Sequence, residues 1–354
     1  AYTRDDRDIF FGRSEEVDQL YEMVFQSDML LVYGASGTGK TSLIQCGLAS
    51  RFQSHDWLAL NVRRGNDFNA SLNKVIQAAG GDTSEDDLIW TEENQRSENS
   101  EISSQRTPLS RSFEAIFLKH FKPIYLIFDQ FEEIYTLGDP LEEQAFVQTI
   151  QEILRLDQPV KIIIIIREEY LGHLYEFERQ VPELLRKKMR VEPMHFDKVQ
   201  SILLGIGNLE QSNVRLQARE ETAIAEIVFD RIRGKEKKRT IELPYLQVFL
   251  DKLYMQIAKD PSRKQEAVFT LSALREMGDI GDVLRNFLDE QVSIIAHNLE
   301  HKPEDLWRIL SQFVSVEGTK EPLTEEDVIQ RLPETDSIFI QKVLHTLISR
   351  RILR

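Results

Sequence analysis

In the N-terminal part of the chain, short apolar runs alternate with longer amphipathic stretches. The runs lie at Met29–Tyr33, Trp57–Val62, Ile124–Phe128 and Ile162–Ile166. The last run consists only of isoleucine, and a β-branched run this pure is typical of a strand buried on both faces of a parallel sheet. Met189, Val191 and Met194 indicate a fifth strand. Strands that alternate with helices predict an α/β fold with a doubly wound parallel sheet and a site at the carboxyl ends of its strands.

Helices are expected where apolar residues recur at the spacing of one helix face. The first begins near Ser14, whose hydroxyl suits an N-cap, and others lie around Phe113–Phe121 and Leu141–Leu156. Between these elements, the polar and acidic stretch from Gly80 to Ser112 keeps no apolar period. It predicts an insertion over about residues 80–112.

Beyond His195 the apolar spacing is helical, and we expect no further strand of the kind described above. Longer helical patterns give way near the C-terminus to three shorter ones, at Leu306–Phe313, Glu325–Leu332 and Ile338–Ser349. Short helices in this succession suit a winged-helix domain. The predicted organisation is an α/β domain over 1–195, a helical domain over 196–280 and a winged-helix-like domain over 281–354.

The α/β domain over 1–195 contains the stretch Gly34-Ala35-Ser36-Gly37-Thr38-Gly39-Lys40-Thr41, which directly follows the first apolar run and predicts an NTPase domain. It matches G-x-x-x-x-G-K-[ST] with a strand before it and a helix after it, which is the phosphate-binding loop of a nucleoside triphosphatase. The backbone N–H groups of such a loop cradle phosphate oxygens, the lysine reaches the β- and γ-phosphates, and the hydroxyl of Thr41 holds Mg²⁺. The residues expected to bind nucleotide here are Ser36, Gly37, Thr38, Gly39, Lys40, Thr41 and Ser42.

A second signature follows the third apolar run, which ends on Asp129 and continues as Gln130-Phe131-Glu132-Glu133. A carboxylate at the end of a buried strand lies beside the phosphate loop, where it can hold Mg²⁺. Glu132 or Glu133 is expected to act as the base for the attacking water, and the pattern does not distinguish between them. The alternative is two exposed acids that favour the first turn of a helix.

Arg167 ends the isoleucine run at the same edge of the sheet. There an arginine can contact the γ-phosphate, so we expect Arg167 to sense it, although an ion pair with Glu168 or Glu169 would also explain the residue. Phe10 and Phe11 either pack on the core or form the adenine side of the pocket. Pro244 either starts a helix or rests its ring on adenine.

The composition of the chain bears on whether it binds nucleic acid or a membrane. The formal net charge of −15 argues against a nucleic-acid surface along the whole chain, although basic clusters occur at 186–190 and 231–239. A single cysteine, Cys46, fits a reducing cytoplasm, and no apolar run is long enough to cross a membrane. The chain starts with Ala, so we expect it to be a piece of a longer protein.

Together these motifs resemble the STAND class of signal-transduction ATPases, specifically the bacterial novel STAND branch. The resemblance covers nearly the whole chain. It is carried by Phe10-Phe11-Gly12-Arg13, by the phosphate loop, by Ile127–Glu133, by Ile166–Gly172 and by Leu243-Pro244-Tyr245-Leu246. It implies that Phe11, Gly12, Arg13 and Pro244 contact the nucleotide and that Arg167 is the sensor arginine.

Membership in this class implies three domains that clamp ATP or ADP, with Mg²⁺, and act as a switch. The ADP state is closed, and exchange to ATP permits self-association; effector and sensor domains would lie outside this chain. Regulation, cell-death signalling and defence against phage are the roles the class implies. A histidine that would contact the β-phosphate has no clear match, since His345 falls within the last helix.

Two other functions fit parts of the pattern. An AAA+-like remodelling enzyme has a similar sheet and helical lid, and would turn over rapidly in a ring. A nucleotide-regulated winged-helix protein would bind DNA through the segments 231–239 and 350–354, with an affinity that falls steeply with salt. A small-molecule kinase fits least, because it has no need of the large helical C-terminal half.

Overall fold

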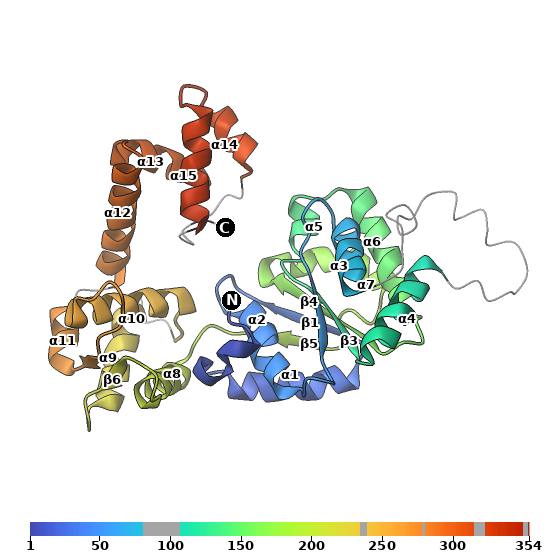
Figure 1. Cartoon of the computed structure of the whole chain (residues 1–354), viewed down its shortest axis with the longest axis horizontal. Coiled ribbons are helices and arrows are strands. Elements are labelled where there is room, and N and C mark those ends of the chain that lie inside the picture. The colour runs from blue at the N-terminus through green and yellow to red at the C-terminus, as the bar shows by residue number, and fades with distance from the viewer. Residues whose placement is uncertain (81–106, 234–238, 278–279, 315–322, 350–352, 354) are drawn as a thin grey trace, which may run out of the picture. The chain divides into compact units, whose positions relative to one another are not determined.

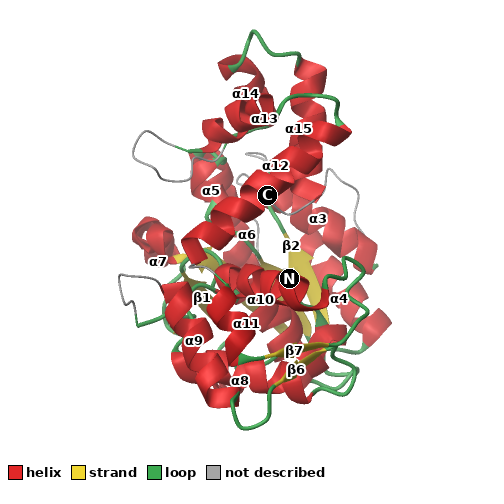
Figure 2. Cartoon of the chain, turned by 90° about the vertical axis from the view of Figure 1, so that its left-hand side faces the viewer, coloured by secondary structure: helices red, strands yellow, loops and turns green. Residues whose placement is uncertain are grey.

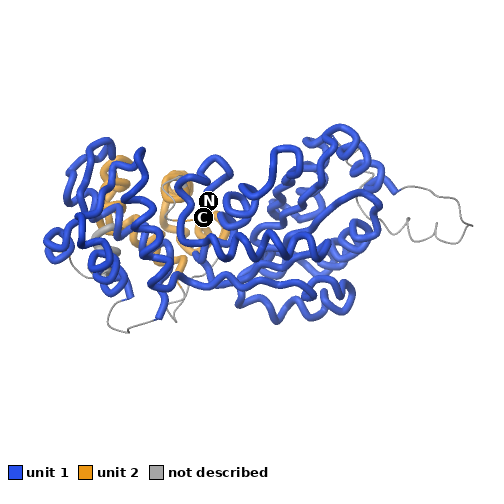
Figure 3. The backbone as a smooth tube through the Cα atoms, turned by 90° about the horizontal axis from the view of Figure 1, so that it is seen from below, with its two compact units in different colours: residues 1–276 blue, residues 277–354 orange. Residues whose placement is uncertain are grey.

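The structure, a computed structural model, describes residues 1–80, 107–233, 239–277, 280–314, 323–349 and 353. The chain forms two compact units, residues 1–276 and 277–354 (Figure 3). The first contains the phosphate loop, the acidic motif Asp129–Glu133 and Arg167, so the candidate site lies in this unit. The expected boundary at 195 falls inside this unit and stays a prediction.

The first unit contains a five-stranded sheet (Figure 1). Its strands are β1 (Met29–Gly34), β2 (Leu58–Val62), β3 (Ile124–Phe128), β4 (Val160–Arg167) and β5 (Lys188–Arg190). The order is β2-β3-β4-β1-β5 and every neighbouring pair is parallel. The prediction of a doubly wound α/β sheet is confirmed. Strand β4, which is the next strand after β3 in sequence, lies between β3 and β1, the two strands that precede the acidic motif and the phosphate loop.

Because successive residues of a strand point to opposite faces, the apolar runs supply two cores. Leu30, Val32, Ile163 and Ile165 face α1 (Ser14–Gln26) and the helix from Lys40 to Arg51, which follows the phosphate loop. That helix contains a π-helical turn over Leu43–Leu48.

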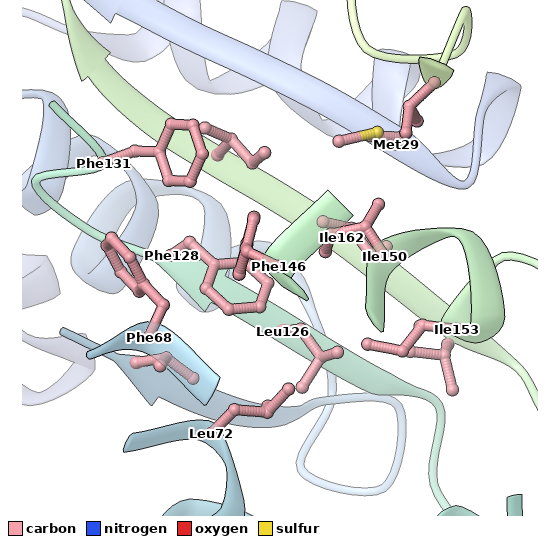
Figure 4. Close-up of a cluster of buried hydrophobic side chains, with 14 of the residues drawn as sticks. Met29, Phe68, Leu72, Leu126, Phe128, Phe131, Phe146, Ile150, Ile153 and Ile162 are labelled. Carbon is pink, nitrogen blue, oxygen red and sulfur yellow. The ribbon is translucent and has the colours of Figure 1, made fainter. Parts of the chain in front are cut away.

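The opposite face of the sheet packs against α3 (Phe68–Ala79), α4 (Pro108–His120), α6 (Pro140–Ile153) and α7 (Leu174–Gln180). Phe68, Phe128, Phe131 and Phe146 meet at its centre (Figure 4). Phe131 lies between Asp129 and the two glutamates of the second motif, and its burial in this cluster anchors the chain that follows Asp129.

The predicted insertion is too long at its C-terminal end. Helix α4 begins at Pro108, not near Phe113, and Leu109 is buried in the core. Thr107 is its N-cap, because its hydroxyl accepts a hydrogen bond from the N–H of Ser110 at 3.1 Å, and proline suits the first helical position. Residues 81–106 of the predicted insertion lie outside the described residues.

The remainder of the first unit is mostly helical, with α8 (Phe196–Asn208), α9 (Glu221–Arg233), α10 (Leu243–Ala258) and α11 (Leu271–Glu276). It also contains two short parallel strands, β6 (Val214–Leu216) and β7 (Ala267–Phe269), which lie side by side (Figure 2). Helices were expected to dominate here, and these two short strands were not predicted. Strands of three residues are too short to produce a recognisable apolar run.

The second unit consists of helices where the structure describes it: α12 (Ile280–Asn298), α13 (Pro303–Leu310), α14 (Glu325–Arg331) and α15 (Ser337–Ser349). Their apolar faces share a core around Ile295, Leu306, Val328 and Ile340. The helical character of this region was expected, and its assignment as a winged helix stays a prediction. No helix in the described ranges of either unit combines the length and the apolar character needed to cross a membrane.

Candidate nucleotide site

The phosphate loop leaves the carboxyl end of β1 in a left-handed, glycine-dependent conformation. Gly37 and Gly39 have φ of 78° and 88°, which residues with a Cβ adopt only at a cost. The Nζ of Lys40 donates hydrogen bonds to the carbonyl oxygens of Gly34 and Ala35, each at 2.8 Å. Burial lowers the pKa of Lys40, as does nearby Arg167, while Glu132, Glu169 and Asp129 oppose this shift. The loop is thus built around a partly buried ammonium group.

Asp129 lies next to the start of the helix that follows this loop. Its Oδ1 accepts hydrogen bonds from the Thr41 hydroxyl at 2.8 Å and from the N–H of Gln130 at 3.1 Å. The side chain of Asp129 is only 2% exposed. A hydroxyl and a carboxylate oxygen in contact beside a phosphate loop are the hard donors that Mg²⁺ prefers, so the residues present fit this ion.

Arg63, which directly follows β2, contacts the site and was not predicted from the sequence. Its Nη2 donates to Oδ2 of Asp129 at 2.8 Å and its Nε to the same atom at 3.2 Å, while the arginine side chain remains 61% exposed. One signal was available: the residue follows a predicted strand, and the carboxyl ends of parallel strands share one edge of the sheet. Without the strand order, however, nothing identified β2 as the neighbour of β3.

Arg167 and Glu132 form an ion pair at this edge. Arg167 Nε lies 2.9 Å from Glu132 Oε1, and the backbone N–H of Arg167 donates to Oε2 at 3.2 Å. Glu168 and Glu169 were the alternative partners expected for Arg167, but Glu168 instead pairs with Arg190 at 2.9 Å. Both carboxylate oxygens of Glu132 therefore contact Arg167, the last residue of β4.

Glu133 is in a different environment. It begins the short helix α5 (Glu133–Thr136), and none of the contacts among described residues engages its carboxylate in a hydrogen bond or ion pair. Burial raises its pKa, and the neighbouring charge of Glu132 raises it further, against the effect of Arg63 and Arg64. Glu132 and Glu133 therefore differ: the carboxylate of Glu132 is paired with Arg167, whereas that of Glu133 has a raised pKa.

The segment before α1 lies against helix α8. Helix α1 begins at Ser14 with Arg13 at the N-cap position, and the expected Ser14 cap is absent. A Cβ added to Gly205 would lie 2.5 Å from the ring of Phe11, so this ring rests on α8. Gly12 has φ of 77° and faces Ile202 of the same helix.

Arg13 itself is 3% exposed and donates to backbone carbonyls of Thr38 and Glu192. It was expected to contact nucleotide, and the structure gives it these protein partners.

Helix α10 begins on the phosphate loop. A Cβ at Gly37 would lie 3.1 Å from Pro244 Cγ, and one at Gly39 would lie 3.1 Å from Leu243 Cδ1. Ser42 accepts a hydrogen bond from the N–H of Tyr2 at 3.1 Å, and Ser36 is half-buried. The sheet edge therefore brings together Lys40, Thr41, Asp129, Glu132, Glu133 and Arg167, and α10 adds Pro244. The nucleotide contacts of all these residues stay predictions.

This arrangement defines a P-loop nucleoside triphosphatase: a phosphate loop after β1, a carboxylate ending β3 and an arginine ending the strand between them. The whole chain, residues 1–354, matches the family Novel STAND NTPase 1, and the protein belongs to this family. The resemblance inferred from the motifs is confirmed. No curated protein is significantly similar to the chain in sequence.

Three solved structures are similar to the chain at low sequence identity. The ORC2 protein of Aeropyrum pernix, solved as ADPNP–ADP complexes, is 13% identical with a TM-score of 0.52, over 96% of this chain and 95% of its own. The ORC1 protein of the same organism in complex with DNA is 15% identical with a TM-score of 0.47, over 97% and 84%. A Walker-type ATPase of Pyrococcus abyssi is 17% identical with a TM-score of 0.46, over 96% and 97%.

Proposed function

We propose that this chain is the nucleotide-binding oligomerisation core of a multidomain signalling protein, active in the cytoplasm in regulation or defence. In this proposal the chain binds ADP or ATP, hydrolyses ATP slowly, and self-associates in the ATP state. Effector and sensor functions belong to other domains or partners. The family supports the NTPase chemistry, and ORC2, solved with ADPNP and ADP, supports adenine nucleotides as ligands.

The observation that carries the proposal is that the phosphate loop is contacted by a helix from outside the sheet. Leu243 and Pro244 of α10 rest on Gly39 and Gly37, respectively. Arg167 is the register partner of Gly34, the residue of β1 at which the phosphate loop begins. A nucleotide between these elements would interact with both. Loss of its γ-phosphate would remove one contact and change the relative stability of two arrangements, which is the requirement for a switch.

The hydrolytic roles follow from the different partners of the site residues. Lys40 would stabilise phosphate charge, and Thr41 and Asp129 would hold Mg²⁺, which would neutralise negative charge during hydrolysis. We assign the general base to Glu133, because its raised pKa lies nearer the operating pH and Arg167 occupies both oxygens of Glu132. Glu132 then holds Arg167 in position for the γ-phosphate.

The test is to identify the nucleotide that co-purifies with the chain, and then to measure turnover and molar mass with ADP and with a non-hydrolysable ATP analogue. We expect retained ADP, turnover well below the median of about 10 per second for enzymes, and a larger mass only with the analogue. Lys40→Ala should abolish nucleotide binding and serves as the control. Several turnovers per second by the isolated chain would contradict the switch, and rapid turnover by a ring that is present with both nucleotides would favour an AAA+-like remodelling enzyme.

The same preparations test the DNA-binding alternative. Nucleic acid is an unlikely partner in this proposal because the net charge is −15. Of the basic segments that suggested it, residues 234–238, 350–352 and 354 lie outside the described residues. Electrophoretic binding that weakens steeply with salt would favour DNA, whereas no shift at low salt is expected here.

A further inference from the structure

Arg13 is a buried charge that joins three parts of the protein. One guanidinium nitrogen donates to the carbonyl of Thr38 in the phosphate loop at 2.9 Å and to the carbonyl of Glu192, between β5 and α8, at 2.7 Å. The other nitrogen donates to Glu16 Oε1 on α1 at 2.5 Å. With 3% of the residue exposed, little of it remains for any further ligand.

The bond to Thr38 constrains the peptide that the nucleotide would use. In a planar trans peptide the C=O and N–H groups point in opposite directions. Arg13 holds the Thr38 carbonyl on its own side, so the N–H of Gly39 points away from Arg13. Gly39 has φ of 88°, a conformation that sets this turn of the loop. A hydrogen bond from a cation to the carbonyl also polarises the peptide, which makes its N–H a stronger donor.

The same cluster reaches helix α8. Lys198 on this helix donates to the Glu16 oxygen that Arg13 also contacts. Burial raises the pKa of Glu16, but hydrogen bonds from Lys198 and Arg13 outweigh it and keep the pKa below its ordinary value, so Glu16 carries its charge. The packing of Phe11 on Gly205 and of Gly12 on Ile202 brings the neighbouring backbone onto the same helix.

We infer that Arg13 is a positioning residue rather than a nucleotide ligand: it holds the Thr38–Gly39 peptide with its N–H toward the phosphates, and Glu16 links this peptide to Lys198 on α8. The inference rests on the proposed nucleotide binding and deepens it. It makes the position of α8 a determinant of phosphate affinity.

The experiment compares three ligands across single variants of the whole chain. Isothermal titration gives the affinities of ADP, ATP and inorganic pyrophosphate for the parent, Arg13→Lys and Lys198→Met. The single nitrogen of lysine cannot occupy both guanidinium positions. Arg13→Lys should therefore weaken all three ligands by the same factor, about tenfold, the size of one misplaced hydrogen bond to a charged group.

Two outcomes would overturn the role of Arg13. Pyrophosphate binding that stays intact while ADP weakens would mean that Arg13 contacts the base or ribose. A much larger loss for ATP than for ADP would mean a direct contact with the γ-phosphate. A parent protein that binds none of the three ligands would refute the proposed function instead, so the two failures are distinguishable.

The link to α8 is tested by a double-mutant cycle. Lys198→Met should weaken ADP about threefold, and the double variant should lose less than the product of the single losses, because both residues act through Glu16. Lys74→Met on α3 is the matched control and should combine multiplicatively with Arg13→Lys. Losses at Arg13 and Lys198 that multiply would overturn the link. Thermal unfolding of each variant tests whether it folds. If Arg13→Lys does not fold, Lys198→Met alone tests the link to α8, because it removes only one of the two cations on Glu16 and should still weaken ADP about threefold.

Discussion

Arg167→Met separates the structural role of the Arg167–Glu132 pair from its proposed role in sensing. The substitution leaves Glu132, whose side chain is 7% exposed, without its cation partner. Removing one partner of a fully buried pair costs about 3–5 kcal/mol. Arg167 is 41% exposed, so water already screens the pair, and we expect the free energy of unfolding to fall by about 1–2 kcal/mol.

The effect on nucleotide affinity should depend on the γ-phosphate. A hydrogen bond to a charged group contributes about 1.5–3 kcal/mol, so ATP affinity should fall by roughly 10- to 150-fold while ADP affinity changes little. Fluorescence titration with labelled ATP and ADP measures both. The double variant Arg167→Met/Glu132→Gln removes the unpaired charge of Glu132 and should therefore recover the free energy of unfolding. Its ATP affinity should recover only in part, because only the loss caused by repulsion between Glu132 and the γ-phosphate is removed.

Arg190→Met is the matched control, since Arg190 pairs with Glu168 at the same distance of 2.9 Å on the neighbouring part of the sheet. It should leave the ratio of ATP to ADP affinity unchanged. The reasoning is refuted if Arg167→Met weakens ATP and ADP equally, or if the double variant regains the full preference for ATP.

Three further predictions concern the phosphate edge. Glu133→Gln should abolish single-turnover hydrolysis while ATP binding persists. Because the pKa of Glu133 is raised, the hydrolysis rate of the parent should begin to fall on acidification at a pH above 4.5. A Glu133→Gln variant that still hydrolyses ATP, with the same loss of rate at acidic pH as the parent, would contradict the assignment. The pKa of Lys40 is lowered from 10.5, so this lysine loses its charge at a lower pH than a free lysine. As the pH rises, ADP affinity should therefore begin to decline before pH 10.5. An ADP affinity that stays constant up to that pH would exclude a charged Lys40 as a phosphate ligand. Arg63→Met should strengthen Mg²⁺ binding to the ADP complex about fivefold to tenfold, the scale of one nearby charge in water, whereas the charge-matched Arg51→Met should not; weaker Mg²⁺ binding would show that Arg63 supports the site.

The local elements of this site could be predicted from sequence because they depend on local chemistry. A run of isoleucine has few stable alternatives to a buried strand, and a glycine-rich turn before Lys40-Thr41 has a restricted set of conformations. The same reasoning failed at Pro108, where the Thr107 cap outweighed the polarity of the preceding segment, and at β6 and β7, which are too short to show a period.

The sequence by itself determined the class of protein: strands, phosphate loop, the carboxylate of Asp129 and the arginine that ends β4. Only the tertiary structure decided which of these groups touch. It paired Arg167 with Glu132, placed Arg63 on Asp129, and buried Arg13 behind the phosphate loop. The physical reason is that motifs are encoded by spacing along the chain, whereas ion pairs depend on the lateral order of strands and the packing of α8, which bring together residues far apart in sequence.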